Sequence, residues 1–174
     1  MISRKLGDSA IELRDGSLVR VLRQVPAASG ARYENGKTLF WNRGDSALLG
    51  RDGGQPLECR ENRRLSLYAD ARSRGVTLRA IGNEPGWVLE IGPGAGGLLN
   101  DRYGQSHLVF ERLTPLPDGA YEGTSGSIRM RVEISDGRCL DDMSGEAHGV
   151  SVRLTLDSGQ SGRESRRGCG ERLR

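Results

Sequence analysis

A serine and an arginine each precede a glycine in two short segments near the start of the chain. Ser29 precedes Gly30 in PAASG, and Arg43 precedes Gly44 in FWNRGD. Small residues let a backbone approach a partner closely, and a planar guanidinium can grip a carboxylate with two hydrogen bonds. A hydroxyl and a guanidinium displayed on loops in this way could bind carboxylates of another molecule.

The same stretch also fits an interpretation without any binding role. A loop serine and a solvated arginine are common at protein surfaces, and Tyr33, Phe40 and Trp41 could simply fill a core. The segment ARYENGKTLFW predicts a β-hairpin, because Asn35 and Gly36 tolerate the positive φ of a type I′ turn. Residue types alone leave the binding role open.

Sequence motifs for catalysis are missing. The chain has no GxSxG elbow, no GxxxxGK[ST] loop and no HExxH pair, and its GPGAGG stretch lacks the lysine and helix of a phosphate cradle. His148 lies near Asp141, Asp142 and Cys139 in sequence, but a single histidine beside turn aspartates is typical of a solvated loop. We expect a protein that is not an enzyme and that uses no metal and no cofactor.

Charge and hydropathy argue against nucleic acid and against a membrane span. Residues 1–62 carry 10 basic and 8 acidic side chains, and residues 74–174 carry 13 and 14. Neither half is a basic patch, so we expect no nucleic-acid partner. The chain has no apolar stretch of about 18 residues, and its first ten residues lack the apolar core of a signal peptide.

Alternating apolar and polar residues predict an all-β protein. Runs such as LVRVL, IRMRVEI and VSVRLTL have the period of half-buried antiparallel strands. We expect two small antiparallel β domains, at residues 1–62 and 76–174, joined at 63–75 by an arginine-rich linker or short helix. Residues 158–167 are expected to form a polar loop. The predicted strands lie near 9–13, 18–25, 31–33, 37–41, 46–50, a segment ending at 59, 77–81, 87–91, 106–112, 127–134 and 150–156.

Residues 29–49 resemble the signature of the membrane-bound and periplasmic inhibitors of C-type lysozyme. In that signature Ser-Gly-Ala-x-Tyr is followed, after a short hairpin, by Phe-Trp-x-Lys-Gly-Asp/Glu-x-Ala, and this chain has SGARY and FWNRGDSA. The resemblance implies a small β barrel that inserts loops into the substrate cleft of its protein partner, C-type lysozyme. The lysozyme-binding residues that it implies are Ser29, Gly30, Ala31, Tyr33, Trp41, Arg43 and Gly44.

The resemblance also implies a role for each polar side chain. Ser29 and Arg43 would hydrogen-bond the two catalytic carboxylates of lysozyme, while Tyr33 and Trp41 set the loop geometry from behind. Arg43 replaces the usual lysine, which keeps the charge but changes its shape, because a guanidinium is wider and planar. The expected location is the periplasm or the outer membrane.

The family usually begins with a strand whose cysteine bridges to the position of Cys59. Met1 follows the place where that strand should lie, so we expect an incomplete barrel and a truncated start. A longer form would carry a signal peptide and the partner cysteine, and it could carry a lipid anchor. An upstream extension of the reading frame is the feature to look for.

The second half resembles an uncharacterised bacterial envelope domain with RxxGNEPxW and CxDxMSG patterns and a closing GCG. This chain has RAIGNEPGW, CLDDMSG and GCG. The resemblance implies a small β domain with a Cys139–Cys169 disulfide and no known activity. The candidate site residues there are Arg79, Asn83, Glu84 and Trp87.

A binding role for these four residues requires Arg79 and Glu84 to converge in a pocket. In the simpler interpretation GNEPGW is only a turn before a strand, because proline fixes φ and asparagine can bond its own backbone. The sequence therefore leaves two candidate functions open. One is inhibition of C-type lysozyme through the first domain, and the other is a non-catalytic envelope-binding module, for glycan or peptidoglycan, that uses the second.

Overall fold

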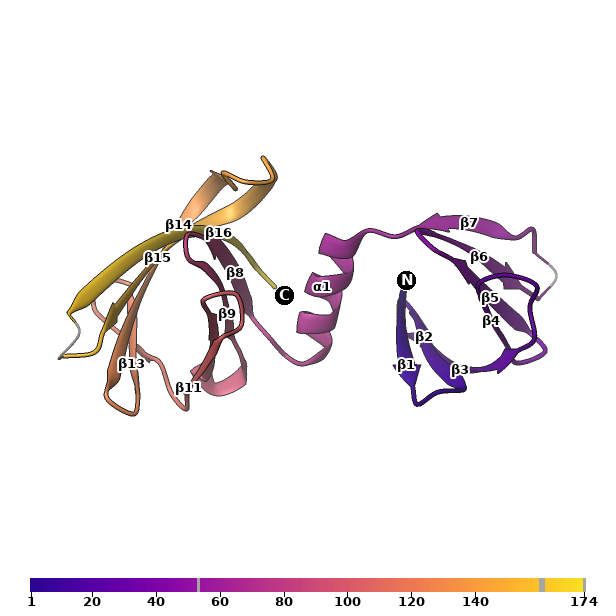
Figure 1. Ribbon diagram of the computed structural model, residues 1–174, viewed down its shortest axis with the longest axis horizontal. Coiled ribbons are helices and arrows are strands. Elements are labelled where there is room, and N and C mark those ends of the chain that lie inside the picture. Colours follow the sequence, from indigo (N-terminus) through magenta and orange to yellow (C-terminus); the bar gives the residue numbers. More distant parts are fainter. Residues whose placement is uncertain (53, 160–161, 174) are drawn as a thin grey trace. The chain divides into compact units, whose positions relative to one another are not determined.

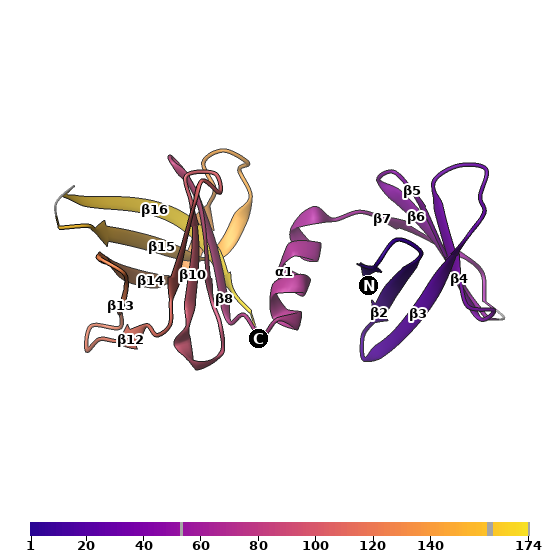
Figure 2. The same cartoon turned by 60° about the horizontal axis from the view of Figure 1, so that its bottom comes forward.

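The computed structural model describes residues 1–52, 54–159 and 162–173, and the chain divides into two compact units, Met1–Asp70 and Ala71–Arg174. Each unit is a curled antiparallel sheet that forms a half-barrel (Figure 1, Figure 2). The predicted all-β fold class is confirmed. The domain limits at residues 62 and 76 stay a prediction, and the division between the units falls inside the segment expected to join them.

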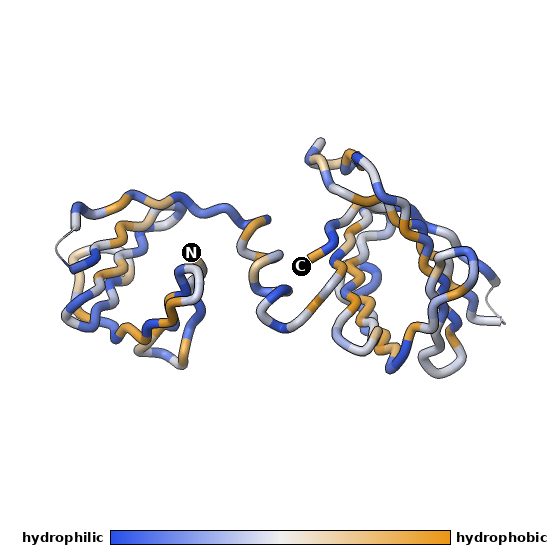
Figure 3. Tube along the Cα trace, turned by 180° about the vertical axis from the view of Figure 1, so that it is seen from behind, coloured by the Kyte–Doolittle hydropathy of each residue, from blue (hydrophilic) through white to orange (hydrophobic). Residues whose placement is uncertain are grey.

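The first unit is a seven-stranded sheet in which each strand pairs with the next along the chain. Its edges are the first and last strands, and its core lies on one face, built from Ile11, Leu13, Leu22, Tyr33, Phe40 and Leu49. Figure 3 shows hydrophobic and hydrophilic residues alternating along these strands. The strands are β1 (Ile2–Leu6), β2 (Ala10–Asp15), β3 (Leu18–Val25), β4 (Ala31–Glu34), β5 (Thr38–Arg43), β6 (Ser46–Arg51) and β7 (Leu57–Arg60).

Strand β1 was not expected, because ISRKL has a charged or polar residue at each of its three central positions. Its pairing with β2 runs from Ile2 opposite Arg14 to Leu6 opposite Ala10. Backbone hydrogen bonding to β2 therefore forms this edge strand without an apolar pattern of its own.

The β4–β5 hairpin lies where the sequence predicts it, but its turn differs from the expected type I′. Gly36 has φ +84°, whereas Asn35 does not adopt a positive φ. The Asn35 side-chain oxygen instead accepts hydrogen bonds from the N–H groups of Lys37 and Thr38, at 3.2 and 2.9 Å. Asparagine thus stabilises this turn through its side chain, and only the glycine needs the left-handed backbone.

Helix α1 (Arg63–Ser73) occupies most of the segment expected to join the two domains. Asn62 caps its start, because its side-chain oxygen accepts a hydrogen bond from the Leu65 N–H at 3.0 Å. Gly75 follows its end with φ +79°, a conformation that suits glycine after a helix. Of the two structures considered for this segment, the short helix is the one that forms.

The second unit is a nine-stranded sheet in the order β11-β10-β9-β8-β16-β15-β14-β13-β12. Its core gathers large apolar side chains from most of these strands, among them Trp87, Leu89, Phe110, Met130 and Leu154. The strands are β8 (Leu78–Asn83), β9 (Gly86–Ile91), β10 (Gly97–Asp101), β11 (Ser106–Phe110), β12 (Thr114–Pro115), β13 (Tyr121–Ser125), β14 (Ile128–Leu140), β15 (Ala147–Asp157) and β16 (Arg163–Arg172), and a short 3₁₀ turn, η1 (Pro93–Ala95), precedes β10.

The expected polar loop at 158–167 is wrong from residue 163 onward, where β16 begins. Residues 160 and 161 lie outside the described residues. β16 carries Arg166 where a core residue would stand, and its guanidinium bonds to Asp101 and Glu164. A buried charge is costly unless it is paired. Because these carboxylates compensate the charge of Arg166, β16 lies at the centre of the sheet although its sequence lacks an apolar pattern. Strands β10, β12 and β13 were also not predicted.

Cys139 and Cys169 form a disulfide, as the resemblance of the second half implies, with 5.5 Å between their Cα atoms. β14 is irregular between Asp136 and Cys139, and beyond this point it still pairs with β15, Cys139 opposite His148. The disulfide ties this extension of β14 to the centre of β16. Cys59 is a free thiol and is partly buried against the core of the first unit.

Candidate functional site

Two loops of the first unit meet at one end of the β4–β5 hairpin. Ala31, which begins β4, pairs with Asn42, the residue before the last of β5. The loop from β3 to β4 therefore arrives beside the turn from β5 to β6, in which Gly44 has φ +64°. Antiparallel pairing alone places Ser29 close to Arg43, although 13 positions separate them in the sequence.

Gly30 is the point where the two loops come closest. It has φ +66°, and a Cβ at this position would lie 2.1 Å from the backbone oxygen of Asn42 and 3.2 Å from the Arg43 Cγ. Only glycine combines this left-handed backbone with so close an approach. The sequence identifies Gly30 only as a small residue, and its close approach to the backbone of Asn42 is known only from the structure.

Trp41 joins the two loops through both its ring and its N–H group. Its indole Nε1 donates a hydrogen bond to the backbone oxygen of Ser29 at 2.8 Å. On the other loop, the Arg43 guanidinium carbon lies 4.0 Å from the centre of the tryptophan ring. This distance allows a cation–π interaction, which holds the guanidinium at a defined place. One side chain thus fixes the positions of both polar candidates.

Exposure separates the predicted residues into a surface group and a supporting group. Ser29, Gly30, Arg43 and Gly44 are exposed, Ala31 and Trp41 are partly buried, and Tyr33 is buried in the core. Within residues 1–52, 54–159 and 162–173, Arg43 has no carboxylate partner. The surface group therefore offers a hydroxyl and a guanidinium to solvent.

Sequence reasoning did not identify two residues that shape this site. Asn42 supplies the backbone oxygen that Gly30 approaches, and the Ser46 hydroxyl donates to the backbone oxygen of Arg43 at 3.3 Å. Both act through the backbone of the β5–β6 turn. Their residue types carried no signal, because an asparagine and a serine beside a glycine turn are ordinary turn residues.

In the second unit, Arg79 does not pair with Glu84. It pairs with Glu90, whose side chain is 7% exposed and which also forms an ion pair with Arg74 at 2.7 Å. The hydrogen bond from Arg74, together with the charge of Arg79, holds the pKa of Glu90 below its ordinary value despite the opposing effect of burial. Arg79 is therefore part of an ion-pair cluster that neutralises a buried carboxylate.

Asn83 connects the β8–β9 turn to the loop after β14. Its side-chain nitrogen donates to Asp141 Oδ2 at 2.8 Å and to Asp142 Oδ1 at 2.5 Å. Burial works to raise the pKa of Asp141, but hydrogen bonds from Ser144 and Asn83 outweigh it and hold that pKa below its ordinary value. The GNEPGW and DDMSG stretches, far apart in sequence, are therefore joined in the fold.

Trp87 and Glu84 have contrasting environments. Trp87 is 2% exposed, and a Cβ on Gly82 or Gly168 would lie 2.2 or 2.6 Å from its indole ring. The ring thus packs directly against two glycines of β8 and β16. Glu84 is exposed in the turn between β8 and β9. The structure does not gather the four candidates of this unit around one cavity.

Comparison with known proteins finds a family similarity in the first unit. The model of a family described as membrane-bound lysozyme-inhibitor of c-type lysozyme matches residues 5–58. This confirms the resemblance predicted from residues 29–49, and the match does not reach the second unit. No curated protein and no solved structure matched the chain. Within the described residues, no helix is long and apolar enough to cross a membrane.

Proposed function

We propose that this protein inhibits C-type lysozyme, with segments 28–33 and 41–45 inserted into the substrate cleft of the enzyme. The match of residues 5–58 to a family of lysozyme inhibitors carries this proposal. An inhibitor has no need of catalytic groups, which agrees with the missing catalytic motifs. The partner is then a protein, and a location in the periplasm or at the outer membrane is consistent with a family described as membrane-bound.

The exposed end of the β4–β5 hairpin suits the occlusion of a cleft that contains carboxylates. A carboxylate covered by an inhibitor loses water, and this is costly unless new donors replace it. Arg43 offers a guanidinium without a competing carboxylate among the described residues, and Ser29 offers an exposed side chain on the adjoining loop. In this mechanism the two side chains bond the two catalytic carboxylates of lysozyme.

The contacts behind the two loops favour binding because they fix the loops in advance. Trp41 bonds to the backbone of Ser29 and stacks with Arg43. Ordering a flexible side chain on binding costs roughly 0.5–1.5 kcal/mol, and the stacked guanidinium has already lost part of this freedom.

Residues 1–62 carry 10 basic and 8 acidic side chains. Long-range attraction to a basic enzyme is therefore weak, and affinity depends on short-range fit.

Replacement of both polar side chains tests the mechanism. The double variant Ser29→Ala, Arg43→Ala is expected to weaken inhibition roughly 100-fold, because each of the two hydrogen bonds to a carboxylate contributes about 1.5 kcal/mol. The measurement is the residual activity of a C-type lysozyme on bacterial cell walls, titrated with each protein.

Two control variants separate this site from general effects of charge. Lys37→Ala removes a positive charge from the opposite end of the same hairpin, and Glu84→Ala alters the second unit. Both should inhibit as the unmodified chain does. Full inhibition by the double variant would contradict the mechanism, and no inhibition by any folded form of the chain would contradict the proposed function itself.

The indole N–H of Trp41 can be tested separately from its ring. Trp41→Phe keeps an aromatic ring beneath the guanidinium but removes the 2.8 Å hydrogen bond to Ser29. A neutral hydrogen bond contributes about 1 kcal/mol, so inhibition should weaken about fivefold. In Trp41→Ala both contacts are lost, and the effect should be clearly larger. Equal inhibition by the two variants would show that the hydrogen bond and the ring have no separate roles.

A further inference from the structure

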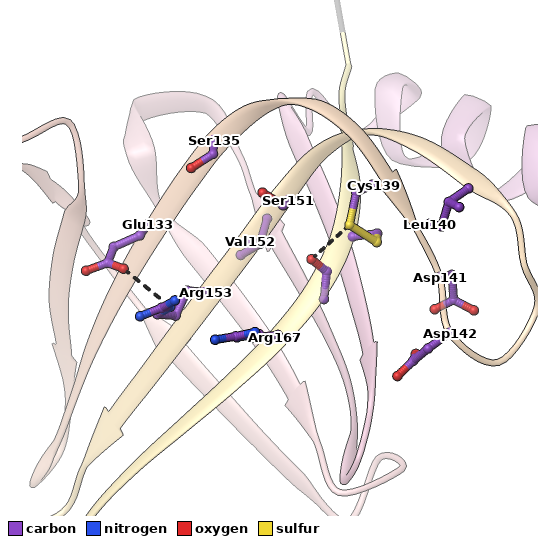
Figure 4. Close-up of a pocket in the computed structure, with 12 residues that line it drawn as sticks. Glu133, Ser135, Cys139, Leu140, Asp141, Asp142, Ser151, Val152, Arg153 and Arg167 are labelled. Carbon is purple, nitrogen blue, oxygen red and sulfur yellow. Dashed lines mark hydrogen bonds and ion pairs between the residues drawn. A yellow bond between two sulfur atoms is a disulfide. The ribbon is translucent and has the colours of Figure 1, made fainter.

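The second unit has a groove of about 600 Å³ on the face of its sheet opposite the core. This volume lies within the range of sites that bind small molecules, about 300–1,000 Å³. Figure 4 shows its side chains on β14, β15 and β16, with the loop after β14 at one end. The lining residues that matter here are Glu133, Ser135, Asp142, Ser151, Arg153 and Arg167.

Three charged residues lie in one row across the floor of this groove. Glu133 pairs with Arg153, and Arg153 pairs with Arg167, on three adjacent strands. The Glu133 carboxylate lies 3.8 Å from the Arg153 guanidinium and also accepts a hydrogen bond from Arg131 on its own strand at 3.2 Å, whereas Arg167 has no ion pair within the described ranges of the chain. Like charges directly opposite each other destabilise a sheet. With two arginines and one glutamate, the row has an excess of one positive charge, which a bound anion would compensate.

The next row supplies neutral donors beside the two arginines. Ser135 pairs with Ser151, and Ser151 pairs with Cys169. Both hydroxyls are exposed, and neither forms a hydrogen bond with the described part of the chain. An anion bound by the two guanidinium groups would therefore have these two serine hydroxyls as hydrogen-bond donors in the adjacent row of the sheet.

The opposite end of the groove is acidic. Asp141 is buried and fully engaged with Ser144 and Asn83. Asp142 is exposed, and Asn83 donates only to its Oδ1 atom. Its Oδ2 atom accepts no hydrogen bond from the residues that the structure describes. This end of the groove therefore offers a fixed carboxylate to a cation, on the far side of the disulfide from the arginines (Figure 4).

We propose that this groove binds a short peptide with free ends, its terminal carboxylate at Arg153 and Arg167 and its ammonium group at Asp142. A planar carboxylate matches the fork of a guanidinium. A phosphate dianion fits less well, because Glu133 lies in the same row and would repel the second charge. This function is independent of lysozyme inhibition, because the groove lies entirely in the second unit.

Trialanine is the probe for a test with the full chain. Binding followed by calorimetry is expected at millimolar or lower concentrations, and Arg167→Gln should weaken it at least tenfold. Arg163→Gln is the matched control, because it removes an exposed arginine from the same face of β16 outside the groove. Its affinity should equal that of the unmodified chain.

Blocked peptides identify which end of the ligand lies where. Trialanine amide should bind at least tenfold more weakly than trialanine, and N-acetyl-trialanine should bind several-fold more weakly. In Asp142→Asn, trialanine and its N-acetyl form should bind equally. The proposal is overturned if trialanine does not bind, if Arg163→Gln weakens binding as much as Arg167→Gln, or if inorganic phosphate binds more tightly than trialanine.

Discussion

Gly30→Ala is expected to weaken the inhibition of C-type lysozyme roughly 1,000-fold, although it adds only one methyl group. The new Cβ would lie 2.1 Å from the backbone oxygen of Asn42, a distance that no folded protein accommodates without movement. It would also force alanine into a left-handed backbone, at about 1 kcal/mol. The loop must move away from β5, and the proposed contact of Ser29 with the enzyme is lost together with its hydrogen bond to Trp41. Losses of about 4 kcal/mol correspond to this change in affinity.

Gly36→Ala is the matched control for this prediction. Gly36 also has a positive φ, +84°, but nothing lies within 4 Å of its added Cβ. The backbone penalty is therefore similar, while the collision is missing, and the turn lies at the other end of the hairpin. Circular dichroism should show both variants folded. Inhibition by Gly30→Ala at the level of Gly36→Ala would rule out the loop containing Ser29 as part of the binding surface.

Gly168→Ala is expected to destabilise the second unit by about 4 kcal/mol and to leave lysozyme inhibition unchanged. A Cβ at this position would lie 2.0 Å from the backbone oxygen of Ile81 and 2.6 Å from the Trp87 ring. Neither neighbour can yield easily, because one is the backbone of an adjacent strand and the other is a buried ring. A loss of this size should lower the melting temperature of the second unit by roughly 15 °C.

Gly92→Ala is the matched control within the same unit. Gly92 has φ −103°, an ordinary value, and the nearest atom to its added Cβ is 3.9 Å away. This variant should melt as the unmodified chain does. Thermal unfolding followed by calorimetry, together with the lysozyme assay, also tests the predicted division into two domains. Loss of inhibition in parallel with the unfolding of the second unit would contradict that division.

The fold class could be predicted because its signals are local. Alternation in LVRVL or VSVRLTL directs apolar side chains to one face of a strand, and Asn35-Gly36 marks a reversal of the chain. These signals do not depend on which strands become neighbours. Strands that lack them, such as β1 and β16, were not predicted. β16 is stabilised by partners distant in sequence, since Asp101 compensates the charge of the buried Arg166.

For the candidate inhibitory site, the sequence by itself identified the residues, and the tertiary structure decided how they are arranged. Ser29, Gly30 and Arg43 carry their signal in residue type and in their resemblance to a known signature. The bond from Trp41 to Ser29 and the contact of Gly30 with Asn42 depend on the register of β4 against β5.

In the second unit, the arrangement of side chains depends on the tertiary structure even more than in the first unit. A binding role required Arg79 and Glu84 to converge, but cross-strand packing pairs Arg79 with Glu90 instead. The row that joins Glu133, Arg153 and Arg167 has no signal in the sequence, because these residues lie on three separate strands. A sequence states which side chains a strand carries. Only the pairing of strands determines which charges face one another, because that pairing depends on hydrogen bonds and packing between segments far apart in the chain.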